Sequence, residues 1–266
     1  MTPEAQILIQ APTGSAGFRA DQITIAWEPH IPPPPPHAAD RLESQWNLCR
    51  QEAAAKGVTL FNGPITQLLA AHPDPSNPEH LQLTLAPSDY KTFIITRMRD
   101  RAWFEQNAPA VMARALGNSA LLSHHRHALF GIRSAKVSAY SHRAHLIGGV
   151  LERLATPDFP ASPAGMISHL LLELSEEAAL APHELEGQPD APRLLAVAHD
   201  HHLGQPEAIW SWPTRIPLDQ IAPRLADAEH SGALILEQGP LSPLHQASLT
   251  PIARLAFDLW SQASRR

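Results

Sequence analysis

Residues 169–180 read HLLLELSEEAAL, and the interpretation of the whole chain depends on this stretch. Its leucines recur at helical spacing. It follows Ser162-Pro163, a pair typical of a helix start because serine caps free N–H groups and proline fits the first turn. On the predicted helix, Glu173 and Glu177 lie one turn apart with Glu176 beside them, so three carboxylates share one face. Such a face is either an ordinary solvated surface or a site for a divalent cation.

The composition limits the class of protein. The chain has 266 residues, of which 44% are hydrophobic, enough to bury a sizeable core. Its one cysteine, Cys49, excludes an internal disulfide and a cysteine-based zinc cluster, and we expect a reducing, cytoplasmic location. No segment approaches the roughly 18 apolar residues that a membrane span needs. A net charge of -6 without a basic patch argues against nucleic acid, so we expect a small-molecule partner; the sequence leaves the oligomeric state open.

The first part of the chain combines strands with one helix. Residues 6–10 and 22–27 are rich in β-formers, and residues 59–71 and 80–86 again look extended. Five consecutive prolines, residues 32–36, predict a stiff spacer outside any helix, which we favour over a docking site for a proline-recognising partner. Apolar spacing then predicts a helix over residues 40–56 with Asp40 as its N-cap. We assign residues 1–115 to a small, strand-rich α+β N-terminal domain.

The second part, residues 116–266, alternates strands with helices. The helix that starts at Ser162 is expected to end at Pro182, and Thr250-Pro251 is expected to open a final helix. Strands with a helix between them and another after them predict an α/β (α+β) fold, with a mixed sheet sandwiched between helices. The strands are expected at residues 120–122, 128–133, 136–139, 193–198, 208–212 and 233–237.

The glutamates also fit a known motif. The Nudix box reads G, five residues, E, seven residues, then R-E-U-x-E-E-x-G-U, where U is a bulky aliphatic residue. Here Gly149 matches the opening glycine, and Glu173, Leu174, Glu176, Glu177 and Leu180 match the E, U, E, E and final U positions. With these residues the sequence resembles the Nudix hydrolases. It departs from the box in a longer loop after Gly149 and at three positions: Ala155, Leu172 and Ala179 replace the first glutamate, the arginine and the last glycine.

These departures are similar to those of one branch, the UDP-sugar diphosphatases that cleave UDP-glucose and UDP-galactose. That branch also has a short strand-rich N-terminal domain, a tyrosine-centred segment like the one around Tyr90, and an Arg-Ser pair like Arg133-Ser134. The resemblance implies Mg²⁺-dependent hydrolysis, with Mn²⁺ as an alternative ion, to UMP and a sugar 1-phosphate. It implies Glu173 and Glu177 as metal ligands and Glu176 as a third ligand or water-positioning carboxylate.

The remaining site residues are implied less directly. Glu229 is a candidate base, because Nudix enzymes often place a glutamate in the corresponding loop. Arg133 is a candidate phosphate contact, equally well read as a surface arginine. His199 ends a strand near the expected substrate. Tyr90 is placed to stack on uracil or, on the plainer interpretation, is buried between the domains.

Three alternatives stay open. A Nudix hydrolase with another nucleoside diphosphate substrate, such as ADP-ribose, fits the same motif. A catalytically silent Nudix-fold binding module fits the loss of the box arginine and first glutamate. The third alternative is a metal site at the histidine-rich residues 123–127 and 199–202. These residues lack a spacing typical of zinc, and we favour solvent-exposed strand ends there.

Overall fold

The computed structural model describes residues 4–12, 15–137, 139–152, 154–157, 159–187, 191–225 and 229–263. Its centre is a mixed sheet with strand order β1-β9-β10-β5-β6-β11, in which β7 pairs with β6 and β8 with β5. The β10–β5 pair is parallel, and the other pairs are antiparallel. The strands are β1 (Ala5–Gln10), β5 (Gly117–His124), β6 (His127–Arg133), β7 (Ala144–His145), β8 (Ile147–Val150), β9 (Arg193–Asp200), β10 (Gln205–Pro213) and β11 (His230–Glu237).

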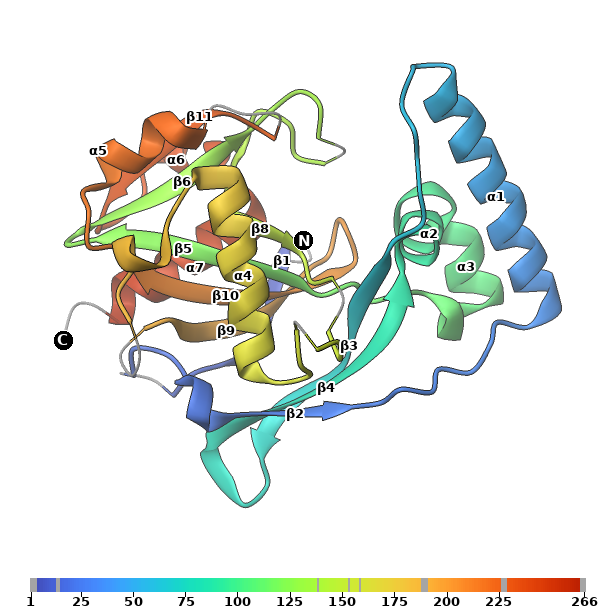
Figure 1. Cartoon of the computed structure of the whole chain (residues 1–266), viewed down its shortest axis with the longest axis horizontal. Coiled ribbons are helices and arrows are strands. Elements are labelled where there is room, and N and C mark those ends of the chain that lie inside the picture. The colour runs from blue at the N-terminus through green and yellow to red at the C-terminus, as the bar shows by residue number, and fades with distance from the viewer. Residues whose placement is uncertain are drawn as a thin grey trace.

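A long helix lies on each face of this sheet (Figure 1). Along β5, Ala120 and Leu122 pack in the same apolar cluster as α4 (Pro163–Ala178), whereas Leu121 packs in the cluster of α7 (Pro251–Ala263). This alternation is the period-two pattern of a strand buried on both faces. Two short helices, α5 (Leu218–Ile221) and α6 (Pro243–Ser248), lie in the connections around β11. The predicted mixed sheet between helices is therefore confirmed.

A smaller sheet connects the first part of the chain to this body. Its strand order is β2-β4-β3, formed by β2 (Ile23–Trp27), β3 (Pro64–Asp74) and β4 (Asn77–Asp89). The backbone of β3 also makes hydrogen bonds to the main body. The N–H of Thr66 donates to the carbonyl of Leu151 at 2.7 Å, and the N–H of Leu116 donates to the carbonyl of Thr66 at 2.9 Å. These bonds hold β3 beside the exit of β8.

The remaining helices form a separate apolar cluster against the small sheet (Figure 1). They are α1 (Pro36–Ala54), α2 (Tyr90–Phe93), a π-helix (Ile94–Arg99) that continues α2, and α3 (Arg101–Asn107). Leu42 and Trp46 of α1 pack in this cluster with Ile95 and Phe104. Within the described ranges, every helix is too short or too polar to cross a lipid bilayer.

Four local expectations were wrong. The helix predicted from Asp40 begins at Pro36, because proline is tolerated in a first turn, where its missing N–H is not needed. Residues 5–10 were expected in the N-terminal unit but pair with β9 of the main sheet. Of residues 136–139, expected in a strand, 136 lies in a turn and 137 and 139 lie in bends, whereas 138 lies outside the described residues. Helix α4 ends at Ala178 rather than at Pro182, because Ala179 adopts a left-handed conformation with φ of 47°.

Candidate active site

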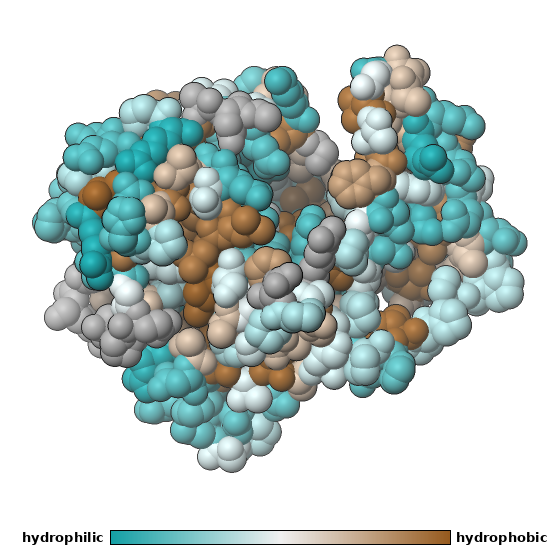
Figure 2. All heavy atoms as spheres, in the orientation of Figure 1, coloured by the Kyte–Doolittle hydropathy of each residue, from teal (hydrophilic) through white to brown (hydrophobic). Residues whose placement is uncertain are grey.

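A pocket of about 630 Å³ opens between the main sheet, α4 and the helical unit around α2. Figure 2 shows the surface hollowed between the body that contains the main sheet and α4 and the helical unit around α2. The pocket is lined by seven residues singled out from the sequence: Tyr90, Arg133, Gly149, Glu173, Glu176, Glu177 and Glu229. His199 is not among the lining residues, whereas its neighbour Asp200 is. His199 instead stacks edge-on against His201, with ring centroids 5.0 Å apart.

Glu173 and Glu177 form the centre of the carboxylate group on α4. Their side chains hydrogen-bond to each other, and Glu177 is only 7% exposed. Burial raises the pKa of both carboxyls, and the negative charges of the neighbouring glutamates raise them further. Both carboxyls therefore keep a proton more readily than an exposed glutamate does. Glu176 also lines the pocket but is exposed to solvent.

The two glycines of β8 allow this close packing. Gly148 has a φ of +133°, and a Cβ atom there would lie 2.5 Å from the carbonyl oxygen of Asn118. Its backbone N–H acts to lower the pKa of Glu177, against the effect of burial. A Cβ on Gly149 would lie 3.1 Å from Oε2 of Glu173. Gly148 thus lets β8 approach β5 closely, and Gly149 leaves room beside the carboxylate of Glu173.

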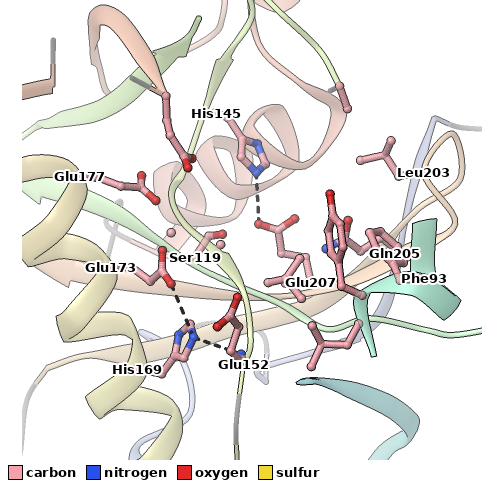
Figure 3. A pocket seen from close by; sticks show the side chains of 18 of the residues that line it. Phe93, Ser119, His145, Glu152, His169, Glu173, Glu177, Leu203, Gln205 and Glu207 are labelled. Carbon is pink, nitrogen blue, oxygen red and sulfur yellow. Dashed lines mark hydrogen bonds and ion pairs between the residues drawn. The ribbon is translucent and has the colours of Figure 1, made fainter. Parts of the chain in front are cut away.

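His169, on the same helix, connects α4 to the end of β8. Its Nε2 accepts a hydrogen bond from the N–H of Glu152 at 3.1 Å, so the ring is neutral with its proton on Nδ1. Burial lowers the pKa of His169 to about 4, which agrees with the neutral form. Nε2 also lies 3.5 Å from Oε1 of Glu173, but a neutral ring makes this a contact and not an ion pair at neutral pH. His169 thus places Glu152 beside Glu173 (Figure 3).

A third group comes from the β6–β11 edge. The carbonyl of Glu229 accepts the N–H of Ser134 at 2.7 Å, and His230 pairs with Arg133 across the two strands. Nε2 of His230 lies 3.7 Å from Oε2 of Glu177. Strand pairing thus brings Arg133, at the end of β6, and Glu229, just before β11, to the same pocket.

The opposite wall holds residues that the sequence analysis did not identify. Glu207 of β10 is 6% exposed, and its Oε1 lies 3.3 Å from Nε2 of His145 (Figure 3). Nδ1 of His145 is hydrogen-bonded to Oγ1 of Thr250 at 2.7 Å, and Ser119 lines the same part of the pocket. Burial acts to raise the pKa of Glu207, but the imidazole of His145 and the hydroxyl of Ser119 outweigh it and hold that pKa below its usual value. No local pattern marks these residues, which lie far apart in the chain.

The carboxylates suit a magnesium ion. Magnesium prefers oxygen ligands, and it keeps several waters while using one or two protein carboxylates together with substrate phosphates. Glu173 and Glu177 supply such a pair, with Glu152 and Glu229 close enough for their charges to act on it. In the described part of the chain, no three His, Cys, Asp or Glu side chains are grouped to hold an ion by themselves. The donor set therefore fits an ion completed by water and substrate, and does not fit a closed structural site.

Comparisons with known proteins give distant similarity only. No protein-family model matches the chain, and no curated protein matches it. Among solved structures it is similar to a Nudix hydrolase from Nitrosomonas europaea, with 15% identity and a TM-score of 0.35 over 55% of this chain and 87% of that one. It is also similar to NrtR from Shewanella oneidensis, with 17% identity and a TM-score of 0.36 over 56% of this chain and 61% of that one.

Proposed function

We propose that this protein is a Nudix-type diphosphatase that uses Mg²⁺ to hydrolyse nucleoside diphosphate sugars, with UDP-glucose or UDP-galactose as substrate. One observation carries the proposal: four glutamates from three separate segments, Glu152, Glu173, Glu177 and Glu229, face one pocket that also contains Arg133. A group of like charges in a partly buried site is costly unless a cation accompanies it. Several carboxylates that hold a cation, together with an arginine, suit a substrate that carries phosphate groups.

The residues divide the reaction between them. Glu173 and Glu177 would hold Mg²⁺, which when bound neutralises the diphosphate and makes water a better nucleophile. Arg133 is held in place because its Nε donates to the carbonyl of Ala139 at 2.9 Å, and its guanidinium supplies charge to a phosphate oxygen. A carboxylate of Glu176, Glu177 or Glu229 would take the proton of the attacking water. The P–O–P bond breaks, and UMP and sugar 1-phosphate leave.

The choice of substrate rests on the sequence resemblance and on the shape of the pocket. A volume of about 630 Å³ is in the range of sites for ligands of this size. Tyr90 and Phe93 of α2 line the pocket and offer aromatic surface for a base, and Tyr90 also packs edge-on against Trp46 at 6.4 Å. This arrangement supports a nucleotide with its base toward α2 and its diphosphate toward α4.

Product analysis tests the proposal directly. The purified protein is incubated with UDP-glucose, UDP-galactose and ADP-ribose in Mg²⁺, beside Glu177→Gln and the control Glu237→Gln, whose exposed carboxylate lies on β11. We expect UMP and sugar 1-phosphate from the UDP-sugars, loss of at least about 100-fold in kcat for Glu177→Gln, and no change for Glu237→Gln. If only ADP-ribose is cleaved, the proposed UDP-sugar substrate is wrong and the proposed hydrolysis of a diphosphate stands. No turnover of any compound would favour a silent binding module.

A further inference from the structure

The chain that follows β6 is fastened to a distant strand by one side chain. Residues 139–143, here called the strap, connect the end of β6 to β7. The hydroxyl of Tyr140 hydrogen-bonds to both carboxylate oxygens of Asp200, at 2.9 and 3.0 Å. Asp200 ends β9, and in the main sheet β10 and β5 lie between β9 and β6. Because Ala139, Tyr140 and Asp200 all line the pocket, the strap reaches across it over two strands.

Asp200 is a fixed anchor for this bond. It is 3% exposed, and its Oδ1 also accepts the backbone N–H of Leu203 at 2.9 Å, within the turn that follows β9. Burial, and then the negative charge of Asp200, raise the pKa of Tyr140 above its ordinary value, so the phenol stays protonated and donates. A hydrogen bond to a carboxylate is stronger than one between neutral groups. The contact is therefore suited to hold the strap in one position.

The backbone of Tyr140 indicates that its side chain holds the strap. Its φ is 52°, a left-handed conformation that glycine adopts freely and a bulky residue rarely does. Besides Asp200, the ring contacts the guanidinium of Arg143, whose Cζ lies 5.7 Å from the ring centroid, and the ring of His202 at 5.5 Å. A strained backbone persists only where its surroundings fix it. We conclude that the contacts of the Tyr140 ring and hydroxyl fix this conformation.

The strap in turn holds Arg133. The Nε of Arg133 donates to the carbonyl of Ala139, the residue before Tyr140, at 2.9 Å. The backbone of Arg133 is bonded to the strap as well: its N–H donates to the carbonyl of Arg143 and its carbonyl accepts the N–H of His142, both at 2.9 Å. Arg133 lines the pocket. The position of its guanidinium therefore depends on where Tyr140 places the strap.

We propose that Tyr140, anchored on Asp200, is a positioning residue that holds the guanidinium of Arg133 ready to contact the phosphates of the substrate. The inference rests on the proposed function, which it deepens by naming what places the phosphate contact. An arginine side chain loses rotational freedom when it binds a phosphate, and holding it in place beforehand reduces that loss on binding. Tyr140 acts on the substrate only through the strap.

Hydrogen exchange at Arg133 tests the positioning directly. The ¹⁵N NMR signal of its Nε–H is identified by its absence in Arg133→Met, and its exchange rate is compared between variants. Tyr140→Phe keeps the ring and removes the hydroxyl, so we expect exchange about tenfold faster or more, because the bond to Ala139 opens more often. The matched control Ser231→Ala removes a hydroxyl that bonds at 3.3 Å to the carbonyl of Ile132, and should keep the wild-type rate. An unchanged rate in Tyr140→Phe would overturn the inference.

Kinetics test whether the position of Arg133 matters to the substrate. The value of kcat/KM for UDP-glucose with Mg²⁺ is measured for Tyr140→Phe, Arg133→Met and the double variant. We expect Tyr140→Phe to lower kcat/KM about tenfold in the wild-type background. In the Arg133→Met background we expect a loss of less than about twofold, because a residue that acts through Arg133 has no effect once Arg133 is gone. Equal losses in the two backgrounds would mean a general structural role and would overturn the inference.

The exchange measurement needs no turnover, so it keeps this result distinct from the proposed function. If the wild-type protein cleaves no compound, the proposed function fails, and the exchange rate still decides whether Tyr140 positions Arg133. If UDP-glucose is cleaved and Tyr140→Phe changes neither exchange nor kcat/KM, the hydrolase stands and the role of Tyr140 is wrong. Faster exchange with an unchanged kcat/KM would also overturn the inference, because the position of Arg133 would then not affect the substrate.

Discussion

Nε2 of His169 accepts a hydrogen bond from the backbone N–H of Glu152 at 3.1 Å. The bond joins the buried face of α4 to the chain just after β8, so one side chain fixes the distance between two walls of the pocket. An imidazole can do this only in its neutral form, and burial maintains that form.

Substitution of His169 should therefore affect both stability and activity. His169→Leu leaves the N–H of Glu152 without its acceptor, and we expect a loss of about 1–3 kcal/mol in the free energy of unfolding. We also expect weaker activity, because Glu152 is no longer held near Glu173. Urea denaturation and steady-state kinetics measure the two effects. His169→Gln retains an acceptor and should recover part of each loss; equal behaviour of both variants would contradict this role.

Gly131 should not tolerate a side chain. A Cβ atom there would lie 2.2 Å from Cδ2 of His230, whose ring must move away from Glu177 to make room. For Gly131→Ala we expect a loss of about 1–3 kcal/mol in stability, together with reduced turnover. Gly63→Ala is the matched control, because its Cβ would meet only Phe61, at 3.5 Å. Equal stability of the two variants in thermal unfolding would disprove the steric argument.

Magnesium should stabilise the folded protein through Glu173 and Glu177. A ligand that binds only the folded state at 100 times its Kd adds about 2.7 kcal/mol to the free energy of unfolding. We expect the Tm to rise by a few degrees with Mg²⁺, and not with Mg²⁺ in Glu177→Gln. Differential scanning calorimetry without nucleotide measures this shift. A shift that persists in Glu177→Gln would place the ion elsewhere, and Glu237→Gln should respond as the wild type does.

The stability of the folded protein at low pH should depend on the contact between Glu184 and Arg224, beyond the end of α4. Both carboxylate oxygens of Glu184 accept from Arg224 at 3.0 Å, and Arg224 also donates to the carbonyl of Ala179 at 3.1 Å. The hydrogen bonds from Arg224 lower the pKa of Glu184 to about 2, below its ordinary value of 4.5. A carboxyl with a depressed folded-state pKa adds stability above its unfolded pKa and loses it as pH falls toward the folded one.

The corresponding measurement compares Glu184→Gln with the wild type by urea denaturation between pH 7 and pH 3. We expect the wild type to be the more stable at pH 7, and the difference to shrink as pH falls below about 4.5. Glu186→Gln, an exposed glutamate nearby whose ion pair with Arg215 spans 4.0 Å, is the control and should show no such trend. A difference that is constant with pH would mean that the carboxylate of Glu184 contributes by packing only.

The sequence by itself determined the features that depend on neighbouring residues. Ser162 and Pro163 predicted the start of α4, because capping and proline in the first turn are local effects. The spacing of Glu173 and Glu177 placed both carboxylates on one helical face, and the strand-like residues 120–122 predicted part of β5. These properties need only three to four residues of context, and the structure confirms each of them.

Only the tertiary structure decided which of these elements meet. Residues 5–10 had the composition of a strand but nothing to identify β9 as their partner. Glu207 looked like one glutamate among many until the parallel pairing of β5 and β10 set it opposite Gly117. His145 is held beside Glu207 by its hydrogen bond to Thr250 at the start of α7. Strand partners and pocket walls are chosen by complementary surfaces far apart in sequence, so no local pattern records them.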